Sequence, residues 1–560
     1  MTRYGDAERA AVADAMKGMW EQARARWSQS LLLTAPVDDP HADGLARLNL
    51  RTREIQVNGA LITKAGLLDS MEAILAHEVG HHVRYPGTFA THTRMLLLER
   101  SLIPIEGYSA SNLFTDLMIN EHLGRQPHTR LELARIYGAL SRDQDWQLDP
   151  AFAFYLTIYE ELWALPPFDL VGEGGPSFEL AYPGCRAEAQ LLGQRLFRLG
   201  PNIYTQFLFF LSVLTRYLEP KKGEHPESQD PCKCDRGAPG PDDWADALEP
   251  NAAERAAIAE ARRQEWISKE DYDRVGGESA FERRIGGLPG HGTDDASQVP
   301  EVMAAYYRLT AERYLFRPPS QRVLGERVVP STLEEWEPGE STHDIDWPAT
   351  LSRHGPVLGR ATPLVRERLP DYEGLEVEMW QPRMEIYLDI SGSMPDPRTT
   401  RNAMTLAAQI LTMSAIRAGG WVRVLLYSQE FVRYWDWCRS EIEISRFLMH
   451  YIGGGTRFPF EVLDASIEEC CDRQPVRVVI SDADFDHNYK TADRGPAIIA
   501  RAAEASASLV LMQHCPSEVS VDEYRRLGAS TITVEDFAAF PKMAAELSLS
   551  LFGDDHGMVS

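Results

Sequence analysis

Basic residues are scarce in this 560-residue chain. It has 57 Lys and Arg against 83 Asp and Glu, which gives a formal net charge of −26. Nucleic acids and anionic membranes need a basic face, so this balance predicts that neither is a partner. Cysteine is also sparse, with seven residues at scattered positions. An odd and scattered set does not indicate a secreted disulfide framework.

Long apolar runs are missing as well. The most apolar segment, residues 203–218, is too short and too polar to span a bilayer, and we expect it to be a buried helix. The first eight residues lack the apolar core of a signal peptide, so the predicted location is cytoplasmic. There is also no Gly-x-x-x-x-Gly-Lys-Ser/Thr phosphate-binding loop, so any ATP hydrolysis must come from a partner protein.

Residues 384–394, Met-Glu-Ile-Tyr-Leu-Asp-Ile-Ser-Gly-Ser-Met, begin as a strand and end in a polar turn. Apolar residues alternate with polar ones up to residue 389, which predicts a strand with its apolar positions in a buried pleat. The turn then gathers three oxygen side chains, those of Asp389, Ser391 and Ser393. Oxygen ligands suit a hard cation such as Mg2+, and open α/β sheets bind ligands at the carboxyl ends of their strands.

This Asp-x-Ser-x-Ser pattern resembles the metal-ion-dependent adhesion site (MIDAS) of von Willebrand factor A (VWA) domains. That family also uses a Thr on a second loop and an Asp after a later strand. Thr456, in Gly-Gly-Gly-Thr-Arg, and Asp482, after the strand 476–481, match these positions. The alternative is an ordinary turn with an N-capping Ser.

The resemblance implies a division of labour among these five residues. Ser391, Ser393 and Thr456 would ligate Mg2+ or another divalent cation directly, and Asp389 and Asp482 would hold metal-bound water. An open coordination position would then accept a carboxylate from a partner protein.

Strand and helix patterns alternate regularly through the C-terminal third of the chain. Apolar strand patterns lie at 421–427, 431–435, 476–481, 508–513 and 531–534. Helical patterns lie at 399–418, 442–452, 459–471, 493–507 and 536–551. This alternation predicts an α/β doubly wound parallel sheet, Rossmann-like in class, over residues 380–553.

A second motif, His77-Glu-Val-Gly-His81, lies inside a helical pattern that Asp69 or Ser70 can cap and Pro86 ends. Residues four apart share a helical face, so both imidazoles can reach one Zn2+. Glu78 falls beside them, where it could deprotonate a metal-bound water. The alternative is a helix that carries these residues by chance.

A catalytic zinc site normally has three protein ligands, and the third must come from elsewhere. Residues 111–123 form another helical pattern, in which Asp116 and Asn120 lie one turn apart. Asp116 is our candidate ligand, and Asn120 could hydrogen-bond a ligand or the substrate. Glu121 and His122 are chemically able to ligate but project differently. Asp116 and Asn120 could also be a solvated face.

A short strand pair within residues 46–63, the His-Glu-x-x-His helix and the Asp-x-x-x-Asn helix together resemble a zincin-like metallopeptidase domain. This domain is found fused to, or encoded beside, bacterial VWA proteins. The resemblance covers roughly residues 40–125 and implies an α+β core. It implies His77 and His81 as zinc ligands, Glu78 as catalytic acid and base, and Asp116 as third ligand. Bacterial VWA proteins often work beside MoxR-type AAA+ ATPases, so such an ATPase, or a protein client, is the implied partner.

The expected organisation is multidomain and mainly helical in its N-terminal part. Residues 1–125 would form the zincin-like domain, 126–220 a helical extension and 221–300 an acidic flexible linker or insertion that carries one charged helix at 252–266. Cys232 and Cys234 within that linker are interpreted as exposed thiols in a loop. Residues 301–379 would form a lead-in helix and extended segment before the VWA domain.

Two functions remain from the sequence. The first is a zinc metallopeptidase that hydrolyses peptide bonds with zinc-bound water and Glu78 as general base, and that recruits a partner through its MIDAS Mg2+. The second is a non-enzymatic VWA adaptor or co-chaperone of a MoxR-type ATPase.

Overall fold

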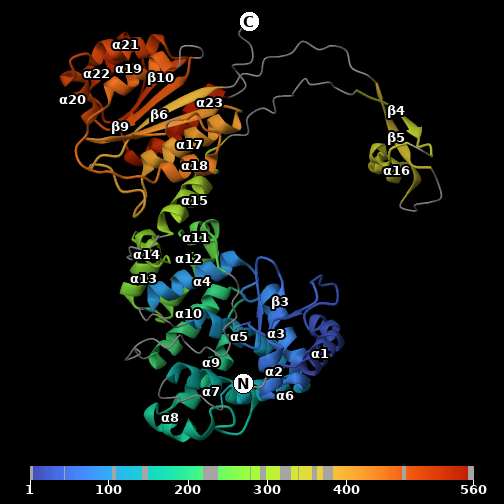
Figure 1. The fold of residues 1–560 in the computed structure, drawn as a ribbon. Coiled ribbons are helices and arrows are strands. Elements are labelled where there is room, and N and C mark those ends of the chain that lie inside the picture. The colour runs from blue at the N-terminus through green and yellow to red at the C-terminus, as the bar shows by residue number, and fades with distance from the viewer. Residues whose placement is uncertain are drawn as a thin grey trace. The chain divides into compact units, whose positions relative to one another are not determined.

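The computed structural model describes most of the chain (Figure 1). The described residues are 4–42, 44–103, 109–141, 149–218, 238–277, 279–289, 298–315, 329–338, 340–355, 362–369, 382–434, 436–469 and 474–552. Contacts between residues divide the chain into two compact units. The first contains 1–313, 390–409 and 442–455, and the second contains 314–389, 410–441 and 456–560. Among the described residues, no helix has the length and apolar character that crossing a membrane requires.

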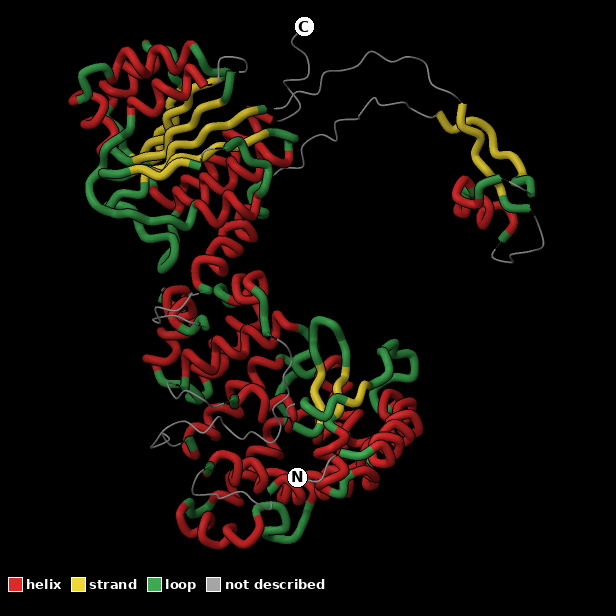
Figure 2. The backbone as a smooth tube through the Cα atoms, in the orientation of Figure 1, coloured by secondary structure: helices red, strands yellow, loops and turns green. Residues whose placement is uncertain are grey.

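The N-terminal region is mainly helical, as predicted (Figure 2). It begins with α1 (Asp6–Ala25), followed by β1 (Val37–Asp38), β2 (Ala46–Leu48) and β3 (Ile55–Val57). These form a small sheet of order β1-β3-β2, with β3 parallel to β1 and antiparallel to β2. The predicted strand pair ends early, because α2 (Gly59–Ala65) occupies the remainder of residues 46–63. The Asn58 side chain starts this helix by accepting a hydrogen bond from the Leu61 amide.

The two motif helices lie close to where the sequence predicts them. The His-Glu-x-x-His motif is on α3 (Met71–Val83), and Asp116 and Asn120 are on α5 (Ala110–Gly124). Around them lie α4 (Phe89–Leu102), α6 (Pro127–Leu140), α7 (Pro150–Trp163) and α10 (Ile203–Leu214). Helix α10 lies in the predicted buried segment and carries eight buried residues. The large apolar core of this region is formed by side chains from these helices.

The described residues within 241–286 contain four helices, whereas the sequence indicates a flexible segment with a single charged helix at 252–266. They contain α11 (Pro241–Ala247), α12 (Ala252–Arg263), α13 (Lys269–Gly276) and α14 (Ala280–Gly286). Buried Glu254 forms ion pairs with Arg94 of α4 at 2.9 Å and with Arg284 of α14 at 2.6 Å. Such a paired charge ties these helices to the first unit, because an unpaired buried charge is costly. Cys232 and Cys234 lie outside the described residues.

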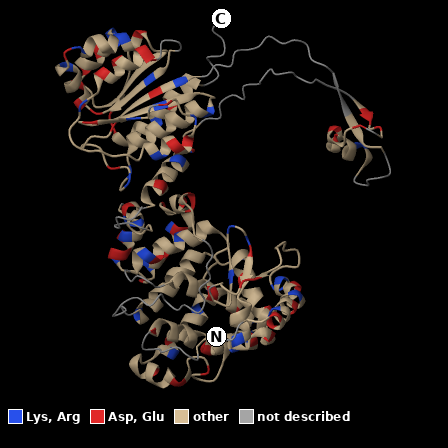
Figure 3. Ribbon diagram, in the orientation of Figure 1, with Lys and Arg blue, Asp and Glu red and all other residues tan. Residues whose placement is uncertain are grey.

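The first unit also contains α8 (Gly175–Ala181), α9 (Cys185–Leu196) and α15 (Val299–Ala311). In the second unit, β4 (Val329–Glu335) and β5 (Leu364–Leu369) pair antiparallel and are accompanied by α16 (Trp347–His354). Acidic and basic side chains are interspersed along the helices of the chain (Figure 3).

The C-terminal sheet is mixed. Its strands are β6 (Arg383–Asp389), β7 (Trp421–Tyr427), β8 (Phe431–Arg433), β9 (Val476–Ser481), β10 (Ser508–His514) and β11 (Ser530–Val534). Their order is β11-β10-β9-β6-β7-β8. All neighbours are parallel except β8, which pairs antiparallel with β7 at the edge. The sequence-based prediction of a wholly parallel sheet is therefore wrong at one edge, where β8 is antiparallel.

Both faces of this sheet are buried. In β6, Ile386 and Tyr387 point to opposite faces and neither is exposed to solvent. The alternating pattern thus marks a two-sided core strand, in which even Glu385 is buried between Arg423 and Arg477 of the neighbouring strands. Helices α17 (Ala403–Arg417), α18 (Glu441–Phe447), α19 (Phe460–Glu469), α21 (Gly495–Glu504) and α23 (Phe540–Phe552) match predicted ones. Helices α20 (Asp484–Thr491) and α22 (Glu518–Arg526) were not predicted.

Candidate metal centres

Helices α3 and α5 pack closely at Gly80, between the two motif histidines. A Cβ atom at Gly80 would lie 2.5 Å from Cζ2 of Trp27 and 2.9 Å from Cγ2 of Ile119 on α5. Only glycine avoids this overlap without a shift of its neighbours. The Trp27 indole also donates a hydrogen bond to the Ala76 carbonyl of α3 at 2.7 Å. This close approach brings the His face of α3 against the Asp116 face of α5.

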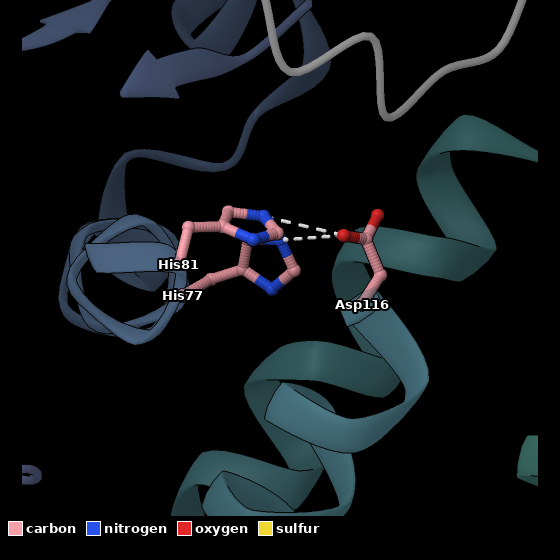
Figure 4. Close-up of side chains that lie close together, drawn as sticks. All are labelled: His77, His81 and Asp116. Atoms are coloured by element: carbon pink, nitrogen blue, oxygen red, sulfur yellow. Dashed lines mark hydrogen bonds and ion pairs between the residues drawn. The ribbon is translucent and has the colours of Figure 1, made fainter. Parts of the chain in front are cut away.

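His77, His81 and Asp116 converge at this packing contact (Figure 4). The two Nε2 atoms are 3.1 Å apart, and Oδ1 of Asp116 lies 3.2 Å from Nε2 of His81 and 3.6 Å from Nε2 of His77. Ligands at 2.0–2.1 Å from a tetrahedral zinc lie about 3.3 Å from one another. The three atoms therefore have the spacing of three corners of a zinc tetrahedron.

The burial of this cluster excludes one of the alternatives that the sequence left open, a solvent-exposed helical face. Asp116 and Asn120 are fully buried, so they are not a solvated face. Among the described residues, His77, His81 and Asp116 are the only His, Cys, Asp and Glu residues grouped closely enough to hold a metal. Glu121 instead pairs with Arg125, and His122 stacks on Trp27 with ring centroids 4.4 Å apart.

The Nδ1 atoms of both histidines face oxygen acceptors. His77 Nδ1 lies 2.8 Å from Oδ1 of Asn120, and His81 Nδ1 lies 2.8 Å from the carbonyl oxygen of Tyr85. An amide or carbonyl oxygen can only accept, so each Nδ1 carries the hydrogen. This tautomer leaves both Nε2 lone pairs available to a cation, which is the arrangement found around metal-binding histidines.

A tyrosine cluster holds Asn120 in place. Its Nδ2 donates to the hydroxyls of Tyr137 at 2.7 Å and Tyr159 at 2.9 Å, and the Tyr155 hydroxyl lies 2.6 Å from that of Tyr159. All three tyrosines are buried. The sequence shows these residues only as aromatic members of helical patterns, which are usually core, so nothing in it identifies them as part of the site.

The electrostatics of the cluster favour a positive charge between its atoms. Burial alone would lower the pKa of His77, but the hydrogen bond and negative charge of Asp116 outweigh it and raise the pKa to about 9. Burial would likewise raise the pKa of Asp116, yet the two imidazoles hold it well below its usual value. The same carboxylate and nitrogen lone pairs that attract a proton here suit a divalent cation.

Glu78 lines a pocket beside this cluster. It is 3% exposed, and it shares the pocket with His77, Asn120 and several aliphatic side chains of α3 and α6. Its carboxylate is thus buried on the same side of α3 as His77. The arrangement therefore offers three ligand atoms, one further carboxylate and an apolar pocket.

A second group of candidate residues follows the central strands of the mixed sheet. In the second unit, Asp389 ends β6 and Ser481 ends the adjacent β9. The Ser481 hydroxyl donates to Oδ2 of Asp389 at 2.7 Å, and both residues are fully buried. From β6 the chain proceeds to β7 on one side, while β9 lies on the other side. The strand order therefore reverses between β6 and β9, the point where open α/β sheets bind ligands.

Asp482 and Thr456 belong to the same unit. Asp482 follows β9 directly, and its Oδ1 accepts a hydrogen bond from the Asp484 amide at 2.9 Å. The backbone carbonyl of Thr456 accepts from the Asn488 side chain at 3.0 Å, so its loop is bonded to the helix that Asp484 begins. Both side chains are partly exposed.

The two serines lie in a turn of the first unit. The hydroxyls of Ser391 and Ser393 are 3.1 Å apart, and the amide of Gly392 donates to the Gly454 carbonyl at 2.7 Å. A Cβ atom at Gly392 would lie 3.0 Å from that carbonyl oxygen. The Asp-x-Ser-Gly-Ser turn and the glycine loop before Thr456 are therefore in backbone contact, which explains the glycines of both.

Comparisons with known proteins do not assign a family. No protein-family model matches the chain, and no curated protein matches it. Among solved structures, the conserved hypothetical protein BatB from Bacteroides thetaiotaomicron aligns over 30% of this chain and 98% of its own, with 13% identity and a TM-score of 0.24. A von Willebrand factor type A structure from Catenulispora acidiphila aligns over 30% of this chain and 42% of its own, with 18% identity and a TM-score of 0.23.

The RO (RSR) protein of Deinococcus radiodurans aligns over 81% of this chain and 91% of its own. Its identity is 14% and its TM-score is 0.23. At such values none of these likenesses carries an argument about this chain.

Proposed function

We propose that the N-terminal region is a zinc metallopeptidase, with His77, His81 and Asp116 as zinc ligands and Glu78 as general base. The observation that carries this proposal is the set of distances among Nε2 of His77, Nε2 of His81 and Oδ1 of Asp116, which range from 3.1 to 3.6 Å. Three protein ligands leave one position of a tetrahedral site for water or substrate, as catalytic zinc sites require.

Each residue of the site has a separate task in this proposal. When bound, zinc would polarise the peptide carbonyl and lower the pKa of a water molecule. Glu78 would take a proton from that water and return it to the nitrogen of the leaving amine. Asn120 and the Tyr85 carbonyl keep His77 and His81 in the tautomer that presents Nε2.

The Glu78→Gln variant tests this function. It keeps the shape of the side chain and the three ligands, so it is expected to bind about one zinc per chain but to lose peptide hydrolysis by at least about 100-fold. Glu121→Gln, at the Arg125 pair on the outer face of α5, is the matched control and should retain activity. Equal activity of the wild type and the Glu78→Gln variant would contradict the role of Glu78.

We also propose that the C-terminal sheet binds a partner protein through a MIDAS-like Mg2+ site. Its direct ligands would be Ser391, Ser393 and Thr456, with Asp389 and Asp482 holding water. Support comes from the reversal of strand order beside Asp389 and from the backbone contact between the serine turn and the glycine loop. The partner would be a MoxR-type AAA+ ATPase or a protein client, and Asp389→Ala should abolish Mg2+-dependent binding to it.

The second candidate function is a non-enzymatic adaptor. Its support is the position of Asp389 at the point where the strand order reverses, which is where open α/β sheets bind ligands. An adaptor would bind its partner with Glu78→Gln as well as with the wild type, and would cleave no peptide in either form.

A further inference from the structure

The pocket beside the zinc ligands has aliphatic walls. Its lining is mainly aliphatic with a few polar groups, which is the usual make-up of small-ligand sites. Leu133, Ile136 and Leu140 of α6 form one wall, and Ala73 and Ile74 of α3 form another. The three α6 residues are three and four apart, so they form one stripe of that helix.

The position of the pocket ties it to the proposed site. Ala73 precedes His77 by four residues on α3, so the pocket opens one helical turn from a zinc ligand. His77 and Glu78 themselves contribute to the lining. A group that fills the pocket would therefore lie next to the atoms that are proposed to act on a peptide bond.

The chemistry of the walls selects the occupant. Glu78 is the only carboxylate among the described lining residues, and none of those residues is Lys or Arg. An acidic substrate side chain would lose its hydration here and meet the like charge of Glu78, and a basic one could pair only with the carboxylate that the proposed reaction uses. An aliphatic side chain would instead exchange water for carbon contacts, which is favourable in proportion to the area buried. Ala73 leaves the room that a larger residue would occupy.

We propose that this pocket binds an aliphatic side chain of medium size, such as that of Leu, Ile, Val or Met, adjacent to the scissile bond of a peptide substrate. The inference rests on the proposed peptidase function and defines its substrate class.

A peptide library tests the selectivity. The full-length, zinc-loaded protein is incubated with peptides randomised at every position, and the cleaved products are sequenced. One position beside the cleaved bond should favour aliphatic over acidic residues by at least about tenfold. Cleavage with equal acceptance of Leu and Asp at every position would overturn the inference while leaving the peptidase proposal intact.

Two variants change the pocket in opposite directions. Ala73→Leu fills it and should move the preference towards Gly and Ala. Leu140→Ala widens it at a partly exposed position and should move the preference towards Phe. The control is Leu131→Ala on the same helix, where the side chain is 67% exposed. Should Ala73→Leu fail to fold, Leu140→Ala still decides, because an unchanged preference in a folded variant contradicts the pocket assignment.

A binding measurement tests the side-chain preference of the pocket independently of peptide hydrolysis. The zinc-loaded Glu78→Gln protein is titrated with leucine hydroxamate and glycine hydroxamate, which share the zinc-chelating group and differ in the side chain. Leucine hydroxamate should bind at least about tenfold more tightly, and Leu140→Ala should reduce that ratio. Equal affinities would overturn the inference. A clear ratio in a protein that cleaves no peptide would keep the pocket and remove the peptidase function.

Discussion

The two candidate metal centres are built from different parts of secondary structure. His77, His81 and Asp116 come from the middles of two packed helices, and each imidazole is oriented by a second hydrogen bond. Ser391, Ser393 and Thr456 instead lie in turns and loops that follow strands or precede helices. Side chains on packed helices are held more rigidly than side chains on loops. The helical site is therefore suited to retain a metal, and the loop site is suited to exchange one.

The chemical types of the ligands at the two centres also differ, and they too suggest tighter metal binding at the helical site. Imidazole and carboxylate ligands favour zinc and bind it tightly, whereas hydroxyl oxygens favour a hard cation that keeps much of its water. Burial follows this pattern only in part: Asp116 and His81 are fully buried, whereas at the loop site Ser391 is buried, Ser393 is exposed and Thr456 is partly exposed. The proposed roles, catalysis at the first centre and partner binding at the second, are consistent with these ligand types.

The largest expected effect is the loss of zinc when a ligand of the helical site is removed. Asp116→Ala should reduce the zinc content of the purified protein from about one per chain to near zero, because two imidazoles alone do not complete a site. Elemental analysis measures the metal directly. Asp389→Ala is the matched control and should keep its zinc, since it alters only the other centre. If the Asp116→Ala variant retained zinc, a residue other than Asp116 would have to be the third ligand.

Removing the support of a ligand should have a smaller effect. Asn120→Ala should weaken zinc binding about 10- to 100-fold, because His77 then loses the acceptor that orients its ring. Competition with a zinc chelator gives the affinity. Tyr159→Phe keeps the amide and removes one of its two hydroxyl partners, so a loss smaller than that of Asn120→Ala is expected. Wild-type affinity in Asn120→Ala would show that ring orientation does not depend on the amide.

The packing that brings the two helices together can be tested at Gly80. Gly80→Ala should lower the free energy of unfolding by about 1–3 kcal/mol, because the new methyl overlaps Trp27 and Ile119. Thermal denaturation measures the change. Gly138→Ala is the control, since a Cβ there meets no atom within 4 Å and alanine favours a helix. A Gly80→Ala protein as stable as the wild type would mean that α3 and α5 can separate without cost.

The smallest expected effect belongs to the loop site. Mg2+ at ten times its dissociation constant should stabilise the wild type by about 1.4 kcal/mol, and Asp389→Ala should abolish that stabilisation. The melting temperature with and without Mg2+ gives the difference. Asp522→Ala, an exposed carboxylate on α22, is the control and should respond to Mg2+ as the wild type does. Desalting should remove the Mg2+ effect while zinc remains bound. Loss of both metals together would contradict the expected difference in metal retention between the two sites.

Much of the sheet was predictable from the chain because strand patterns are local. The bounds predicted for β7 and β9 agree with the structure, and both strands are mainly apolar although each contains one arginine. Helices α20 and α22 were missed because they are short and carry many polar residues. The antiparallel pairing of β8 was also beyond prediction, since strand direction depends on which neighbour a strand meets.

The sequence by itself determined that His77 and His81 share one side of a helix, because four residues make about one helical turn. It likewise determined that Asp389 ends one strand and that Ser391 and Ser393 follow it. Only the tertiary structure decided that Asp116, and not Glu121 or His122, meets the two imidazoles, and that Asn120 and three tyrosines support them. The physical reason is that helical spacing acts within one element, whereas the choice among α5 side chains depends on how α5 packs against α3 at Gly80.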